Sequence, residues 1–333
     1  MGVRSFSVLV IYRTAERIVG CMGATGRTVR VAVIGVGHLG QHHARIYTEL
    51  PGVELVAVAD VAEDRRREVG NRLRVAAVTD YRKLLRQVDA VSVAVPTLLH
   101  HQIARDFLLT GSDVLVEKPI TRKLAEADDL IAVAAAGERI LQVGHSERYN
   151  GGVQALAAHV QDPGFIEVHR MGPFPGRGTD VDVVLDLMIH DIDIILTLVK
   201  APVTAVSAVG VPVVSDQVDI ANARLEFASG CVANITASRV TGERLRKIRV
   251  FQRDTYFVLD YAKQELHLLR PRRPGDPNQS RLRRVDIAVA RVEPLRQELQ
   301  DFLGSVRSRR PPMVPGEAGR DAVAVAAQII ERL

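Results

Sequence analysis

One glycine-rich turn constrains the fold of this chain more than any other feature. Val29–Ile34 is a short run rich in β-branched residues, which is typical of a strand buried on both faces. It is followed by Gly-Val-Gly-His-Leu-Gly at 35–40, a helical stretch to about Leu50, and a second apolar run, Val53–Ala59, that ends at Asp60. Strand, glycine turn, helix, strand and acid in this order predict the first unit of a nucleotide-binding α/β fold.

The same turn also predicts the ligand. Gly35 permits a tight turn, Gly37 lets the backbone approach a pyrophosphate, and Gly40 allows helix and strand to pack closely. Asp60 lies twenty residues beyond Gly40, where a carboxylate accepts hydrogen bonds from an adenosine ribose and repels a 2′-phosphate. The pattern therefore favours NAD over NADP as the cofactor. Arg65–Arg67 weaken that preference, although their place in the next predicted helix indicates a solvent-exposed face.

Short strands continue to alternate with helices as far as about Asn150. This alternation predicts an α/β fold with a parallel, doubly wound sheet, whose ligands bind at the carboxyl ends of the strands. The residues expected to leave those ends include Pro96-Thr97, Glu117-Lys118-Pro119 and Gly144-His145. We therefore expect the reactive part of the site among them.

After Asn150 the pattern changes to short alternating runs without helices between them, which predicts a second, largely antiparallel sheet. A helix expected over Val181–Leu198 carries Asp186 and His190, which are four residues apart and so share one face. The chain is thus predicted to hold two domains, 29–150 and 151–333, after a flexible extension over residues 1–28. The arginine-rich segment Arg270–Arg284 is interpreted as a solvent-exposed loop, with a contact to nucleotide-sugar phosphates as the alternative.

The composition excludes several classes of function. Lys and Arg number 44 against 39 Asp and Glu, a mild excess spread along the chain rather than the dense basic face that nucleic acid requires. No uncharged stretch exceeds fifteen residues, whereas a membrane-spanning helix needs about 20. Charged residues interrupt the one signal-peptide-like run, near the N-terminus. The two cysteines form neither a disulfide framework nor a zinc motif, which favours a reducing, cytoplasmic compartment.

Four motifs carry a family resemblance. They are GVGHLG at 35–40, EKP at 117–119, GHSERYN at 144–150 and DLMIHDID at 186–193. Together they resemble the Gfo/Idh/MocA oxidoreductases, in order, from about Val29 to the C-terminal helix. The resemblance implies a Rossmann domain followed by an α/β domain with an open antiparallel sheet that often mediates homodimers or homotetramers. It also implies hydride transfer between a nicotinamide and a secondary alcohol of a sugar or cyclitol.

The resemblance also implies the roles of the site residues. Lys118 matches the family lysine that contacts the nicotinamide side and the reacting hydroxyl, His190 its general base, and Asp186 the acid that supports the base. These roles agree with the chemistry, because histidine can accept a hydroxyl proton at neutral pH and an ammonium group stabilises a developing alkoxide. The expected cofactor contacts are Gly35, Gly37, His38, Leu39, Gly40, Asp60, Pro96, Thr97, His100, Glu117 and Lys118. The expected substrate contacts are Lys118, His145, Arg148, Tyr149, Arg177 and His190.

Other nearby residues are expected to have no direct part in the reaction. His42 and His43 lie on the first predicted helix and are interpreted as structural. Asp191 and Asp193 are expected on other helix faces than His190, and no metal is expected. The family often has Pro where this chain has Gly151, a difference expected to alter the start of the following helix rather than the chemistry.

The identity of the substrate depends on a finer likeness. The segments GRGTDVD and DVVLDLMIHDIDIIL resemble a branch of the family that oxidises nucleotide-linked amino sugars, such as UDP-N-acetylglucosamine at C3. Arg148, Tyr149, Arg170 and Arg177 would then serve recognition of the nucleotide sugar, whose diphosphate needs positive partners. Inositol or a free sugar is the alternative substrate, and a non-catalytic NAD-binding sensor or scaffold is the alternative of another class. The joint presence of the expected lysine, acid and histidine favours an enzyme.

Overall fold

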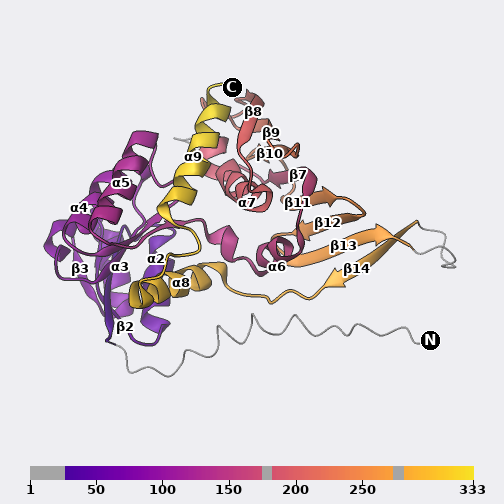
Figure 1. Cartoon of the computed structure of the whole chain (residues 1–333). Coiled ribbons are helices and arrows are strands. Elements are labelled where there is room, and N and C mark those ends of the chain that lie inside the picture. Colours follow the sequence, from indigo (N-terminus) through magenta and orange to yellow (C-terminus); the bar gives the residue numbers. More distant parts are fainter. Residues whose placement is uncertain (1–26, 175–181, 273–280) are drawn as a thin grey trace, which may run out of the picture.

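The computed structural model describes residues 27–174, 182–272 and 281–333, and Figure 1 shows two sheets with helices around them. The extension expected over residues 1–28 lies outside the described residues except for its last two. Of those, Arg27 forms an ion pair with Asp89.

The first sheet is parallel and has the strand order β3-β2-β1-β4-β5-β6, with helices on both faces, so the predicted doubly wound sheet is confirmed. Its strands are β1 (Val29–Ile34), β2 (Val53–Ala59), β3 (Ala76–Val78), β4 (Ala90–Val93), β5 (Asp113–Glu117) and β6 (Leu141–Gly144). The elements between and after them are α2 (Gly40–Glu49), α3 (Glu63–Leu73), η1 (Tyr81–Leu84), η2 (Thr97–Leu99), α4 (His100–Leu109), α5 (Leu124–Ala136) and η3 (Ser146–Tyr149).

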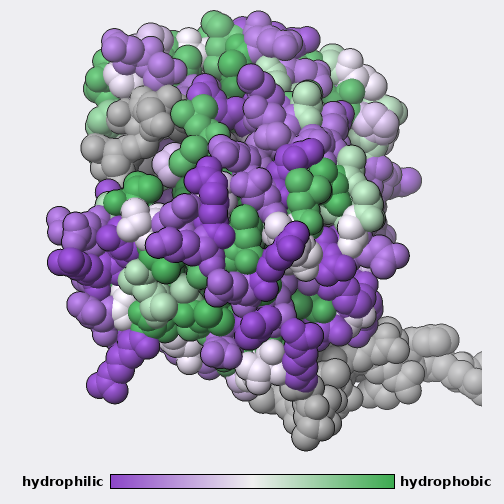
Figure 2. Space-filling view, turned by 90° about the vertical axis from the view of Figure 1, so that its left-hand side faces the viewer, coloured by the Kyte–Doolittle hydropathy of each residue, from purple (hydrophilic) through white to green (hydrophobic). Residues whose placement is uncertain are grey.

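The alternation of side chains along β1 explains why this sheet needs helices on both sides. Val31 and Val33 point into one hydrophobic core, and Ala32 and Ile34 point into the other. Each core is closed by helices whose outer surfaces face water, and the surface on this side of the molecule is largely hydrophilic (Figure 2). None of the described helices has the length and apolar character needed to cross a membrane.

The second sheet has the order β14-β13-β12-β11-β7-β10-β9-β8, and all its neighbouring strands are antiparallel except β7 and β10. This confirms the expected largely antiparallel sheet. Its strands are β7 (Pro163–Met171), β8 (Val203–Val211), β9 (Ile220–Phe227), β10 (Val232–Ser238), β11 (Leu245–Gln252), β12 (Thr255–Asp260), β13 (Glu265–Pro271) and β14 (Leu282–Ile287). The helical elements of this half are α6 (Gly151–His159), η4 (Val184–Met188), α7 (Ile189–Val199), α8 (Pro294–Ser308) and α9 (Gly316–Ile330).

The arginine-rich segment Arg270–Arg284 differs from its prediction at its two ends, and residues 273–280 lie outside the described residues. Leu282–Ile287 is not loop but a strand that pairs with β13, with Arg283 opposite Arg270 and Arg284 opposite Leu269. Backbone pairing at the sheet edge supplies hydrogen bonds that the side-chain composition of the segment did not reveal. In Figure 1 this edge lies on the opposite side of the molecule from the first sheet, so the alternative of a phosphate contact there has no support.

The C-terminal helices return to the first sheet. Leu299, Phe302 and Leu303 of α8 belong to the core that β1 and α2 close, and α9 packs against both α5 and α7. Figure 1 shows these two helices alongside the first sheet and its helices. The division of the chain at Asn150 therefore stays a prediction, since the last helices contact both halves.

Gly151, where the family often has Pro, begins α6. A Cβ atom at this position would lie 1.9 Å from the carbonyl oxygen of Ala290, so the two backbones approach too closely for any side chain. The Gly151 N–H also donates to Gln264 Oε1 at 3.2 Å, a bond that proline could not make.

Candidate active site

A cavity of about 730 Å³ runs along the carboxyl ends of the strands of the first sheet. The carboxyl ends of parallel strands lie at one edge of the sheet, so loops that are far apart in sequence meet there and line one cavity. Of the expected cofactor contacts, Gly35, Gly37, His38, Leu39, Asp60, Pro96, Thr97, Glu117 and Lys118 line it. The cavity ends at Leu185 and Asp186 of η4, so it connects the glycine turn with the predicted catalytic helix.

The three glycines meet the demands expected of them. Gly35 has φ +85°, a conformation that favours glycine, and a Cβ atom at Gly40 would lie 1.8 Å from the Gly35 carbonyl oxygen. At Gly37 the nearest atom to such a Cβ is Arg65 Nη1 at 3.6 Å, which leaves the backbone open to the cavity. Gly40 does not line the cavity but lets α2 pack on the turn. The turn therefore fits a pyrophosphate above the start of α2.

Asp60 is held in a fixed orientation at the end of β2. Its Oδ2 accepts the Val36 N–H at 2.9 Å and its Oδ1 accepts the Ala62 N–H at 2.8 Å. Each oxygen keeps a further lone pair, so the carboxylate fits the two ribose hydroxyls of an adenosine. These observations show that the residues present fit NAD.

The arginines after Asp60 differ in their contacts, although Arg65 and Arg67 are exposed, as expected for a solvent-exposed face. Arg67 is exposed and pairs with Glu63, as predicted. Arg66 instead donates to the main-chain oxygen of Asp60 at 2.8 Å, and Arg65 lines the cavity next to the glycine turn.

His100 requires a correction, because it does not line the cavity. It is 1% exposed, and its Nδ1 and Nε2 each lie 2.9 Å from a carbonyl oxygen, those of Pro119 and Val95. The ring therefore joins the loop after β4 to the loop after β5 from behind. Its contribution is to hold two cavity-lining loops together.

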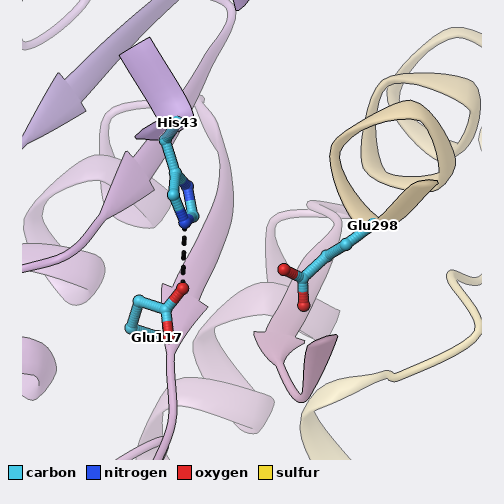
Figure 3. A group of neighbouring side chains, drawn as sticks. All are labelled: His43, Glu117 and Glu298. Atoms are coloured by element: carbon cyan, nitrogen blue, oxygen red, sulfur yellow. Dashed lines mark hydrogen bonds and ion pairs between the residues drawn. The ribbon is translucent and has the colours of Figure 1, made fainter. Parts of the chain in front are cut away.

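A buried cluster supports the residue before Lys118 (Figure 3). His43 of α2 hydrogen-bonds Glu117 through Nε2 and Oε1 at 2.9 Å, and the carboxyl group of Glu298 on α8 points toward this pair. Burial opposes ionisation of Glu117, but the hydrogen bond from His43 and the charge of Lys118 outweigh it and lower the pKa of Glu117. The interpretation of His43 as structural is thus consistent with its contacts, and it anchors the loop that carries Lys118.

Glu298 is the second acid of this cluster and is fully buried. Neither of its carboxyl oxygens has a hydrogen-bond partner within the described residues. Burial, together with the charges of Glu117 and Asp301, raises the pKa of Glu298 well above its ordinary range. One ligand atom from each of the three side chains falls within 4.8 Å of the others, but a cation there would have to break the bond between His43 and Glu117. The expectation that the protein holds no metal stays a prediction.

Lys118 and Asp186 meet at the end of the cavity, although 68 residues separate them. Lys118 Nζ donates to the main-chain oxygen of Asp186 at 2.7 Å and lies 3.5 Å from its Oδ1. Asp186 lies on the π-helical turn η4, whereas the sequence predicted an ordinary helix. Such turns are frequent at functional sites. The contact brings the expected cofactor lysine to the helix that bears the expected base.

His190 follows in the first turn of α7, and its Nδ1 is buried without a hydrogen-bond partner in the described part of the chain. Burial lowers the pKa of His190 well below its ordinary value, and the positive charges of Lys118 and Arg170 lower it further. His190 is therefore neutral at physiological pH and can accept a proton.

His145 lies beside His190, with the two rings edge to face and their centroids 6.2 Å apart. It is 1% exposed, and both of its ring nitrogens are buried without a partner among the described residues. Burial lowers the pKa of His145, so this ring too is uncharged. Its contact with substrate stays a prediction.

Two residues that were expected to contact substrate form bonds with acidic side chains of the protein. Arg148 forms a two-pronged ion pair with Asp193, with both N–O distances 2.7 Å, and Tyr149 is buried and donates to Asp301 at 2.7 Å. Arg170, also considered for the diphosphate, binds Asp191 and Glu147. Asp191 and Asp193 are thus bound by arginines, and their orientation away from His190 stays a prediction, as does any contact of the three side chains with substrate. Arg177 lies outside the described residues.

These features define the class of the protein, an oxidoreductase that uses NAD on a Rossmann fold. Residues 29–145 match the family model described as an oxidoreductase family with an NAD-binding Rossmann fold, and residues 151–255 match the Gfo/Idh/MocA C-terminal domain. The chain belongs to the Gfo/Idh/MocA family.

Similar proteins include several named dehydrogenases. UDP-N-acetylglucosamine 3-dehydrogenase of Acidithiobacillus ferrooxidans is 38% identical over 302 residues, which cover 90% of this chain and 96% of that protein. A solved structure of that enzyme covers 92% of this chain and 97% of its own, at 37% identity and a TM-score of 0.86. Myo-inositol 2-dehydrogenase of Thermotoga maritima is 30% identical over 315 residues, covering 89% and 93%.

Proposed function

We propose that this enzyme oxidises the C3 hydroxyl of UDP-N-acetylglucosamine with NAD and produces the 3-keto sugar. The observation that carries the chemistry is the placement of Lys118 at the end of the cofactor cavity, near an imidazole, His190, that is kept neutral. The likeness to UDP-N-acetylglucosamine 3-dehydrogenase over 90% of the chain supports the choice of substrate.

In the proposed reaction a secondary alcohol loses a proton and a hydride, and a carbonyl group forms. Bound NAD supplies the hydride acceptor. His190 accepts the hydroxyl proton, because its low pKa leaves a ring lone pair free at neutral pH. The Lys118 ammonium stabilises the negative charge that develops on the oxygen. Asp186 holds Lys118 through its main-chain oxygen and lies near the ammonium with its carboxylate.

The cofactor contacts follow from the walls of the cavity. The glycine turn at Gly35 and Gly37 receives the pyrophosphate and Asp60 receives the adenosine ribose. Lys118 and Glu117 lie at the opposite end, where the nicotinamide is expected.

Inositol is the second candidate substrate, because myo-inositol 2-dehydrogenase of Thermotoga maritima is 30% identical over 89% of the chain. Both candidates undergo the same reaction at a ring hydroxyl. They differ in the nucleoside diphosphate that only one of them carries.

The test is formation of NADH by the purified full-length protein with UDP-N-acetylglucosamine, N-acetylglucosamine or myo-inositol. A hydrazine trap for the ketone removes product, so that an equilibrium favouring the alcohol does not hide the reaction. Turnover with UDP-N-acetylglucosamine supports the proposal, and turnover with myo-inositol alone overturns it. Binding of NAD without turnover of any of the three substrates would favour the sensor.

Two variants test the assigned roles. Lys118→Met and His190→Asn should lower kcat by about 10²- to 10⁴-fold while the Kd for NAD changes little. Lys123→Met and His159→Asn are matched controls at exposed positions and should retain full activity. Unchanged kcat in Lys118→Met or His190→Asn would contradict the mechanism.

The family resemblance also supports a homodimer or homotetramer, and the two isolated cysteines support a cytoplasmic location. Light scattering of the purified protein measures the first, and fractionation of the producing cell measures the second. A monomer at all concentrations would contradict the expected assembly.

A further inference from the structure

Arg246 is the cation near His190 that the sequence analysis missed. It is the second residue of β11 and lies opposite Arg170 of β7 in the register of the sheet. Residues alternate between the two faces of a strand, so Arg246 shares a face with Ile248 and Val250. Those two residues are buried in the core that α7 also closes. Arg246 therefore lies on the same side of the sheet as α7, and its partly covered side chain keeps accessible surface because it stands at the strand end.

The other cations in this region already lie beside carboxylates. Lys118 lies near Asp186, Arg170 is bound by Asp191 and Glu147, and Arg148 is bound by Asp193. In the described residues the Arg246 side chain has neither a hydrogen bond nor an ion pair.

Arg246 is close enough to the reaction centre to influence it. Its positive charge is among those that lower the pKa of His190. Partial burial lowers the pKa of Arg246 and the neighbouring Arg170 charge adds to this effect, whereas the charges of Glu147 and Asp191 oppose it. Glu147 and Asp191, the nearby carboxylates, are both bound to Arg170, so the Arg246 guanidinium group can take a further anionic partner.

We propose that Arg246 binds the diphosphate of the nucleotide-linked sugar while Lys118 and His190 act on the ring hydroxyl. The planar guanidinium fork matches the oxygens of a phosphate group. In a nucleotide sugar the diphosphate is attached at C1, two ring positions from the C3 hydroxyl that reacts, which requires a cation beside the catalytic pair rather than within it. This inference rests on the proposed function. It names the residue that would make the enzyme bind a nucleotide sugar in preference to a neutral polyol.

The location of Arg246 is consistent with this role. Arg246 stands opposite Arg170 of β7, and Arg170 binds Asp191 of α7, the residue that follows His190. Figure 1 shows α7 next to β7, which places the catalytic helix over this part of the sheet.

The test is the variant Arg246→Gln, with steady-state kinetics for UDP-N-acetylglucosamine and titration calorimetry with UDP in the presence of NAD. The KM for the nucleotide sugar and the Kd for UDP should rise about 10- to 100-fold, with the Kd for NAD within twofold of wild type. Arg246→Lys should restore part of the affinity, because it retains the charge but not the fork. Unchanged KM and unchanged Kd for UDP in Arg246→Gln would overturn the assignment.

The matched control is Arg249→Gln. Arg249 lies on the same strand but on the opposite face, where it pairs with Glu167 at 2.7 Å. Its loss should leave both affinities unchanged, and an equal effect in the two variants would overturn the specific role of Arg246.

The two proposals fail separately. If wild type oxidises myo-inositol only but still binds UDP, and Arg246→Gln weakens that binding, the proposed function is wrong and the anion site stands. If wild type oxidises UDP-N-acetylglucosamine and Arg246→Gln has wild-type kinetics and UDP affinity, the function stands and the anion site is wrong. If wild type neither oxidises the nucleotide sugar nor binds UDP, both are wrong.

Discussion

Replacing Glu298 with glutamine should change how the stability of the protein depends on pH. Glu298 is fully buried, its carboxyl oxygens have no partner in the described structure, and it points at a pair in which Glu117 is already ionised (Figure 3). Two adjacent carboxylates cannot both ionise in such a pocket without a large cost. The native protein therefore keeps Glu298 protonated, in accordance with its raised pKa.

The sign of the effect follows from the two states of the chain. In the unfolded state Glu298 ionises above its ordinary pKa of 4.5, whereas in the native state it retains the proton. Its contribution to stability is therefore fully present below pH 4.5 and decreases as the pH rises toward the native pKa. One extra proton on the native state corresponds to a slope of about −1.4 kcal/mol per pH unit in the free energy of unfolding. Between about pH 5.5 and about pH 7.5 this amounts to roughly 2.7 kcal/mol.

The glutamine side chain has a similar shape and cannot ionise, so Glu298→Gln should gain roughly 2.7 kcal/mol relative to wild type over that interval. The assay is unfolding in guanidinium chloride at several pH values. The free energy of unfolding is taken from the transition in which the Rossmann sheet, against which α8 packs, unfolds. Glu317→Gln on α9 is the matched control, because Glu317 is exposed, and its difference from wild type should not vary with pH. A Glu298→Gln curve parallel to that of wild type would refute the reasoning. Repetition in EDTA identifies a bound cation, since only a cation-held, ionised Glu298 would make the result depend on the chelator.

Three further predictions follow from the site. Lys118→Met removes a positive charge that lowers the pKa of His190, so the acid limb of the pH profile of the variant's residual kcat/KM should move to higher pH. It should not move above about 6.5, because burial still lowers the pKa of His190. An unmoved limb would mean that the titrating group is not His190. Asp60→Asn keeps an acceptor for the Val36 N–H but removes the charge that repels a 2′-phosphate, and the ratio of kcat/KM with NADP to that with NAD should rise about tenfold or more; an unchanged ratio would contradict the role of Asp60. Gly40→Ala places a methyl group 1.8 Å from a carbonyl oxygen and should reduce stability by about 1–3 kcal/mol and weaken NAD binding. Gly304→Ala, which has open space around it, is the control and should be neutral or stabilising. Equal effects of the two variants would show that the close approach at Gly40 is unimportant.

Much of the fold could be predicted because its signals are local. The period-2 and period-3.6 patterns and the glycine turn act over a few residues, and they identified the parallel sheet, the antiparallel sheet and their order along the chain. Two elements were not predicted. Leu282–Ile287 forms a strand only because β13 offers it an edge, and the helix carrying Asp186 begins with a π-helical turn that no periodicity reveals.

The candidate site was predicted in part. The side chains that follow strand ends in sequence were identified, since the parallel sheet necessarily brings those ends together. The roles of the arginines were not predicted, because a guanidinium group is available to a ligand only where no carboxylate of the folded protein already pairs with it. Arg148 is occupied by Asp193, whereas Arg246 has no such partner among the described residues. The inward-facing alternation of Arg246, Ile248 and Val250 was the sequence signal that could have revealed it.

The sequence by itself determined the class of fold and the cofactor, because backbone conformation and residue chemistry along the glycine turn depend on near neighbours, and the family resemblance predicted Lys118 and His190 as the catalytic pair. Only the tertiary structure decided which charges are available for a ligand and which serve the fold. His43, Glu117 and Glu298 come from three distant segments, and their protonation depends on burial and on one another. Ionisation and pairing are set by distances between side chains across the folded core, and a linear order of residues does not contain those distances.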